Sequence, residues 1–232
     1  MSKSTAARPI PVALTALVAF FSALAALAVS GGMNMAQAHA PMTMSVHSSA
    51  APSPKAVALE MDMRKLWEDH ITWTRLAIIS LESGTPDTGA TVARLLKNQA
   101  DIGNAVKPFY GKAAGTALTQ LLREHILIAA DLIAAAKAGD QAKLADAQAR
   151  WTANADEIAA LLHSANPRYW PLGDMKSEMH RHLDLTAAEA LARLHGDWAG
   201  DVAAYDKVHR HILHMADMLS AGLIAQFPGR FR

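Results

Sequence analysis

Apolar residues recur at helical spacing from residue 58 to the C-terminus, and this spacing limits the fold more than any other feature of the chain. No stretch of this region alternates apolar and polar residues, as a half-buried strand requires. Glycine and proline interrupt the pattern at 84–86, at 108–111, at 139 and in the loop SANPRYWPLG. We therefore expect an all-α fold, an antiparallel bundle of four to five long helices.

The interruptions divide this region into separate helical segments. We expect Asp140 to cap the fourth segment, because its side chain accepts hydrogen bonds from first-turn amides. Thr186 and Glu189 match a capping box, which predicts a helix start at that point. Gly196 and Gly200 are expected to kink or divide the last region. The predicted helical ranges are 58–83, 87–107, 112–138, 140–164, 174–184 and 186–226.

The N-terminal part of the chain has the layout of an export signal. Lys3 and Arg8 precede the apolar run IPVALTALVAFFSALAALAVS, and the small residues AQAHA follow as a cleavage site. The run is close to the ~20 residues that span a bilayer, so an uncleaved membrane anchor is the alternative. We expect residues 1–40 to form the signal peptide or anchor, 41–57 a flexible linker, and 58–232 one helical-bundle domain. The domain is then exported, either periplasmic or secreted, with or without a membrane anchor.

The composition excludes several classes of protein. The chain has no cysteine, so disulfides, thiolate metal sites, iron–sulfur clusters and covalent haem attachment are ruled out. A net charge of +1 with interspersed charges gives no electrostatic footprint for nucleic acid. The motifs HExxH, GxSxG, GxGxxG, a P-loop and paired Glu-x-x-His are absent. We therefore predict no nucleic-acid partner. The missing motifs favour a noncatalytic protein but leave the question open, because a bound metal with an open position would permit catalysis.

A short motif occurs in two of the expected helices. In LWEDHI the acids Glu68 and Asp69 directly precede His70. In LLREHI the acid Glu124 directly precedes His125. At about 100° per residue, both histidines fall on the apolar face of their helix. Asp69 and Glu124 lie on the shoulder of the same faces. The repetition indicates that both helices bring an imidazole, with an acid beside it, toward the bundle interior.

The C-terminal stretch HRHILHMADM carries imidazoles and thioethers in one helix. Helical geometry turns His211, Met215 and Met218 toward the interior or its border. Asp201 lies on the same inward face, seven helical positions before Val208. In the preceding segment, His182 also lies on an inward face.

Buried imidazoles and carboxylates need hydrogen-bond partners, ion pairs or a metal, and bundles build metal sites from such groups on facing helices. We predict that the interior binds a transition metal (Cu, Zn, Fe or Mn) or a small cofactor. One alternative is a noncatalytic envelope protein with a hydrogen-bonded polar core, and another is noncovalent b-type haem with His and Met ligands. The candidate metal ligands are His70, His125, His182, His211, Asp69, Glu124 and Asp201, and the candidate cofactor contacts are Met215 and Met218.

Four segments also carry a resemblance to a known group of proteins. LWEDHITWTRL, LLKNQADIGNAVKPFYG, LLREHILIAADL and DMLSAGLIAQFP resemble an uncharacterised family of bacterial helical proteins. The resemblance covers most of residues 62–232 and implies one helical domain. Members of that family are automatically named glycosyltransferase or acetylglutamate kinase, but the sugar-nucleotide and ATP-binding motifs that these names require are missing here. The resemblance implies no catalytic residues.

Overall fold

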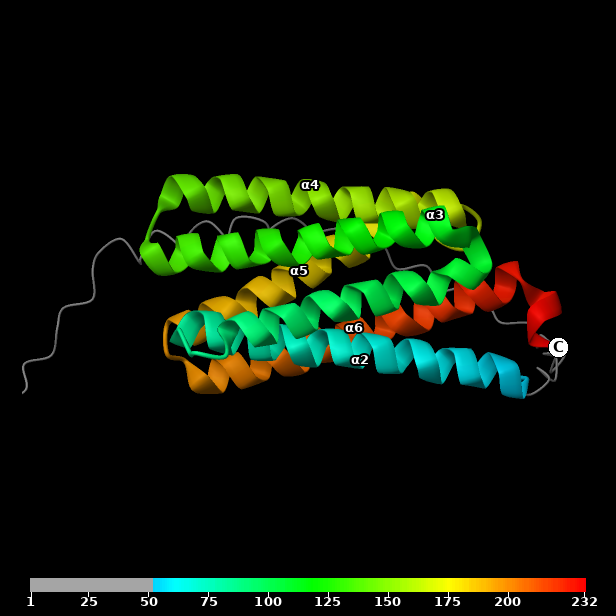
Figure 1. Cartoon of the computed structure of the whole chain (residues 1–232), viewed down its shortest axis with the longest axis horizontal. Helices are drawn as coiled ribbons and strands as arrows, with labels where there is room; N and C mark the ends of the chain where they lie inside the picture. Colours follow the sequence, from blue (N-terminus) through cyan, green and yellow to red (C-terminus); the bar gives the residue numbers. More distant parts are fainter. Residues whose placement is uncertain (1–51) are drawn as a thin grey trace, which may run out of the picture. The chain divides into compact units, whose positions relative to one another are not determined.

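The computed structural model describes residues 52–232, which fold into α-helices followed by one 3-10 helix (Figure 1). No strand occurs in this range, so the predicted all-α bundle is confirmed. The predicted signal peptide or anchor, and most of the predicted linker, lie outside the described residues. Within residues 52–232, no helix combines the length and the apolar character needed to cross a membrane. The elements are α2 (Pro54–Ser83), α3 (Thr88–Ala138), α4 (Gln141–Ala165), α5 (Leu172–Leu194), α6 (Trp198–Gln226) and η3 (Pro228–Phe231).

The first described helix begins four residues earlier than predicted. Ser53 caps α2, because its hydroxyl accepts a hydrogen bond from the Ala56 amide at 3.2 Å. Pro54 occupies the first turn, where its missing N–H costs nothing. Residues 54–57, which we assigned to the linker, are therefore helical.

Helix α3 consists of two arms, residues 88–110 and 112–138, joined at Gly111. Gly111 has φ 83° and ψ 172°, a conformation that is open essentially to glycine alone. The break therefore lies where the sequence predicted it, and the chain reverses direction there (Figure 1). The backbones of the arms touch, since a Cβ on Gly103 would lie 2.5 Å from the Gly115 carbonyl oxygen.

The helices form a closed ring around a common core. In that ring α2 packs on α3, α3 on α4, α4 on α5, α5 on α6, and α6 returns to α2. Successive segments, with the two arms of α3 taken separately, run antiparallel along the bundle (Figure 1). Side chains from every segment can therefore meet at one level of the interior.

The predicted capping box is wrong. Helix α5 runs unbroken through Thr186 and Glu189. Thr186 Oγ1 donates to a carbonyl one turn earlier at 2.8 Å, as a residue inside a helix does. The break comes instead at Gly196, whose φ is 71°. Asp197 caps the next helix, α6, because its Oδ1 accepts from the Gly200 amide at 2.9 Å.

The described chain is a tandem of three helical hairpins. The hairpins are α2 with the first arm of α3, the second arm of α3 with α4, and α5 with α6. The first helix of each hairpin ends at a glycine with positive φ, namely Gly84 (64°), Gly139 (70°) and Gly196 (71°). Each of these glycines comes 14 residues after a buried histidine. The three hairpins thus place a histidine at the same height in the core, at His70, His125 and His182.

Candidate functional site: a layer of buried histidines

Four histidines from different helical segments meet in the core around His182. The ring centre of His182 lies 5.9 Å from that of His70, 6.2 Å from that of His125 and 6.1 Å from that of His211. No side chain of the four exceeds 6% exposure. The structure thus brings together the four histidines that helical geometry placed on inward faces. We call this group the histidine layer.

Amide side chains hold two members of the histidine layer. Gln99 Nε2 lies 3.2 Å from His70 Nδ1, and Asn154 Oδ1 lies 2.9 Å from His125 Nδ1. Gln99 Nε2 also donates to a backbone carbonyl at 2.9 Å, so His70 Nδ1 faces a donor and its Nε2 carries the proton. Asn154 Nδ2 donates to a backbone carbonyl at 3.1 Å, so its Oδ1 accepts from His125 Nδ1. In that tautomer, His125 Nε2 carries a free lone pair.

Two ring nitrogens in the histidine layer have no hydrogen-bond partner. His125 Nε2 and His182 Nδ1 are buried and unpartnered within residues 52–232. By contrast, His211 Nε2 donates to the Glu178 carbonyl oxygen at 3.1 Å. Buried polar atoms normally have a hydrogen-bond partner, and a water molecule or a bound ion would supply the one that each of these nitrogens lacks.

A small cavity adjoins the histidine layer. It encloses about 30 Å³ of free space, enough for about one or two water molecules or a single ion. Its walls are apolar apart from three imidazoles and the indole N–H groups of Trp67 and Trp170. The thioethers that share these walls with His70, His125 and His182 are Met63, Met179 and Met215. The cavity thus combines imidazole nitrogen with sulfur and has no carboxylate on its walls.

The histidines that line the cavity are neutral at physiological pH. Burial lowers the pKa of His70 to about 3, with a further contribution from the nearby His125. Burial likewise lowers the pKa of His125 to about 4 and holds that of His182 well below its ordinary value. Neutral imidazole is the form that binds metals.

The carboxylates that we predicted as ligands do not join the histidine layer. Asp69 pairs with Lys65 at 3.0 Å and with Arg94 at 3.7 Å at the edge of the bundle. Glu124 is exposed. These side chains lie on the shoulders of their helices, as expected, but the shoulders face solvent and basic side chains rather than the cavity.

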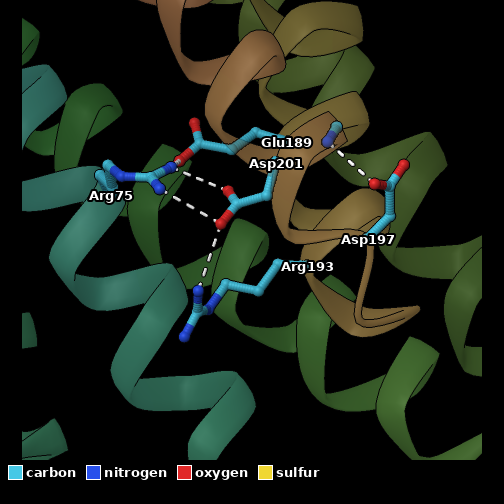
Figure 2. Close-up of polar contacts among 6 residues, drawn as sticks. Arg75, Glu189, Arg193, Asp197 and Asp201 are labelled. Atoms are coloured by element: carbon cyan, nitrogen blue, oxygen red, sulfur yellow. Dashed lines mark hydrogen bonds and ion pairs between the residues drawn. The ribbon is translucent and has the colours of Figure 1, made fainter.

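Asp201 belongs to a separate buried ion network (Figure 2). Arg75 of α2 reaches Glu189 of α5 at 2.7 Å and Asp201 of α6 at 2.8 Å, and Arg193 adds a contact to Asp201 at 3.2 Å. Glu189 is fully buried, and this burial raises its pKa to about 7. The ring of Tyr205 covers the Arg75 guanidinium at 4.7 Å. The network ties three helices together, and its ion pairs with Arg75 and Arg193 hold both carboxylates away from the histidine layer, although Glu189 Oε2 has no hydrogen-bond partner within residues 52–232.

The two predicted methionine contacts have different positions. Met215 is buried and lines the cavity, whereas Met218 is half-buried and lies outside its walls. Gln99 and Met63 were not among the predicted site residues. Gln99 had a usable signal, because it follows His70 by 29 residues, the same interval that separates His125 from its amide partner.

Within residues 52–232, no three or more His, Asp or Glu side chains converge so as to hold a metal ion. Two of the four imidazoles already have hydrogen-bond partners, because Gln99 contacts His70 and the Glu178 carbonyl oxygen accepts from His211. The remaining donors are the unpartnered nitrogens of His125 and His182 and the thioethers beside them. That set suits a metal with a low coordination number.

Comparisons of the chain with protein-family models, curated proteins and solved structures found no match. The resemblance to uncharacterised bacterial helical proteins therefore stays a prediction. The functional argument rests on the histidine layer and its cavity.

Proposed function

We propose that the protein binds a monovalent copper ion in the cavity beside the histidine layer. One observation carries this proposal: His125 and His182 each have an unpartnered ring nitrogen, and both line a cavity that three methionines also line. Imidazole and thioether together are a donor set that suits Cu(I). Binding would give both orphan nitrogens the partner that the protein does not supply.

Charge favours a monovalent ion over a divalent one. Moving a monovalent ion from water to a low-dielectric interior costs on the order of 20 kcal/mol before it is compensated, and this cost grows with the square of the charge. The walls of the cavity contribute no carboxylate that would offset a second positive charge. Zinc, iron and manganese commonly bind with anionic ligands, which are missing here.

The spacing of the rings supports a shared ion between His125 and His182. With metal–nitrogen bonds of about 2.0–2.1 Å, two imidazoles on opposite sides of one ion have ring centres roughly 6.5 Å apart. The observed separation is 6.2 Å, and the two ring planes differ by 25°. The free space of about 30 Å³ has no room for a porphyrin, so we do not propose haem.

Copper titration of the untagged protein under reducing, oxygen-free conditions tests this proposal. We expect one Cu(I) per chain, retained against a competing chelator, with X-ray absorption showing nitrogen and sulfur neighbours. His125→Gln and His182→Gln should each weaken binding at least about 100-fold, since each removes one of few ligands. His214→Gln, at an exposed position of α6, is the matched control and should bind as the parent does. The absence of stoichiometric copper in the parent would refute the proposal.

A second candidate function is a noncatalytic protein in which the histidine layer only specifies the packing of the hairpins. The amide contacts of His70 and His125 favour it, because each fixes two helices in register. The same titration separates the candidates. A ligand that binds only the folded state raises its melting temperature, so an unchanged melting curve with Cu(I) would favour the packing role.

Export is part of the proposal for copper binding. The signal layout lies in residues 1–40, outside the described residues, and would place the copper site beyond the cytoplasm. N-terminal sequencing of the mature protein tests it. Cleavage after Ala38 or Ala40 is expected, and a retained N-terminus in a membrane fraction would indicate the anchor instead.

A further inference from the structure

An open groove of about 420 Å³ lies between α5 and α6, and its charge is uncompensated. Exposed Arg181 of α5 lines it together with exposed Lys207 and Arg210 of α6. Across residues 52–232, none of these three side chains forms an ion pair or a side-chain hydrogen bond. Glu178 is the one carboxylate on its walls.

Several cations elsewhere on the bundle do have carboxylate partners. Arg64 pairs with a carboxylate at 2.6 Å, Arg150 at 2.8 Å and Lys176 at 2.8 Å. In the groove, three positive side chains repel one another, and clustered like charge raises the local potential toward anions. An anion bound there would relieve this repulsion.

We propose that the groove binds the phosphate group of a small molecule. The Arg, Lys and Glu side chains on its walls have a net formal charge of +2. A phosphate monoester carries about −1.5 to −2 at neutral pH, so the charges match. Two guanidinium groups supply the planar, paired donors that phosphate oxygens accept. A volume of about 420 Å³ also falls in the range of small-molecule sites, roughly 300–1,000 Å³.

The floor of the groove adjoins the histidine layer. His211 lines the groove, yet it is only 6% exposed, and its ring centre lies 6.1 Å from that of His182. Its Nε2 donates to the Glu178 carbonyl, which fixes the ring at the base of the groove. The imidazole resonance of His211 should therefore report a bound anion, whereas that of His125 should change less. This proposal does not depend on copper.

Phosphate titration of the full mature protein, held metal-free with a chelator, tests the proposal by NMR. Inorganic phosphate should produce saturable amide shifts in residues 178–185 and 207–214 and at His211, with a dissociation constant of about 1 mM or lower. The double variant Arg181→Gln/Arg210→Gln should weaken binding at least about tenfold. The matched control Lys143→Gln/Arg150→Gln removes the same charge from cations of α4 that already have carboxylate partners. It should bind as the parent does.

Further ligands identify the source of the phosphate. Stronger binding of glycerol phosphate than of phosphatidic-acid vesicles indicates a soluble ester, and the reverse order indicates a lipid headgroup. Equal binding of phosphate, sulfate and citrate would overturn phosphate recognition in favour of generic attraction. The proposal also fails if no saturation occurs by about 10 mM, or if both double variants lose affinity equally. Because the chelator removes metal from these experiments, none of their results tests copper binding.

Discussion

Acid should destabilise this protein through its histidine layer, and the effect can be assigned to single residues. The pKa of His125 is about 4 in the folded protein and near 6.5 when the chain unfolds. Because its folded pKa is lowered, the unfolded chain binds the proton first as the pH falls. Stability is therefore complete above pH 6.5 and is lost progressively down to about pH 4.

The magnitude follows from proton linkage. A pH of 5 is 1.5 units below the pKa of the imidazole in the unfolded chain, so that imidazole is protonated, whereas His125 in the folded protein is still neutral. This difference lowers the free energy of unfolding by about 2 kcal/mol. His70 should contribute a similar loss, since its folded pKa is about 3. Glu189 acts in the opposite direction, because its pKa of about 7 makes protonation at pH 5 favour the folded state. The parent's total pH dependence therefore mixes both signs.

A comparison of variants isolates the histidine contribution. Urea unfolding is measured by tryptophan fluorescence at pH 7 and at pH 5 for the parent and for His125→Gln. The variant should lose about 2 kcal/mol less than the parent between these pH values. Asn154→Ala is the control, since it removes the partner of His125 but keeps the titrating ring. It should be less stable at both pH values yet retain the parent's pH dependence. An identical pH dependence in the parent and His125→Gln would refute the reasoning.

Three further predictions concern the site and the fold. Copper affinity should change by less than about twofold between pH 7.5 and 5.5, as measured by chelator competition. Burial lowers the pKa of His125 to about 4 and that of His182 well below its ordinary value, so protons do not compete for these ligands. Gly103→Ala should lower the free energy of unfolding in urea by about 1–3 kcal/mol, since its Cβ would overlap the other arm of α3. In the control Gly89→Ala the new Cβ meets nothing within 4 Å, so this variant should be about 0.5–1 kcal/mol more stable than the parent. Arg75→Leu should cost about 3–5 kcal/mol, because it removes the partner of buried Glu189 and leaves buried Asp201 paired with Arg193 alone (Figure 2). Arg64→Leu at an exposed pair should cost about 1 kcal/mol or less.

Local chemistry in the sequence predicted most of the fold. Glycines at 84, 111 and 139 end helices because the backbone there needs positive φ, and this requirement is visible without tertiary information. Asp140 caps α4 as expected, with its Oδ1 accepting from the Lys143 amide at 3.1 Å. The capping box at Thr186 failed because the same local pattern also occurs inside helices. Glu189 is held by an arginine 114 residues earlier in the chain, which no local rule detects.

The candidate site was predictable only in part. Helical periodicity identifies an inward face, so it placed the histidines in the core. It does not reveal which charged side chains from other residues lie opposite. The ion pairs that Asp69 forms with Lys65 and Asp201 forms with Arg75 were therefore not predicted. The recurrence of 14 and 29 residues was present in the sequence and would have linked His182 to the EDH and REH motifs. A search for an acid directly before a histidine does not find the third copy, because that copy reads HRH.

The third hairpin departs from the other two where function is proposed. Gln99 and Asn154 each engage the Nδ1 atom of their histidine, but the equivalent position after His182 holds His211, which bonds to a backbone carbonyl instead. His182 Nδ1 therefore stays unpartnered at the centre of the layer, at a cost of about 1–3 kcal/mol. Leucine would fill the same space without that cost. His182→Leu should accordingly melt at or above the parent's temperature without metal, and should lose the stabilisation by Cu(I) that we expect for the parent. A large loss of metal-free stability in this variant would show that His182 is needed for packing, and the argument for a ligand would fall.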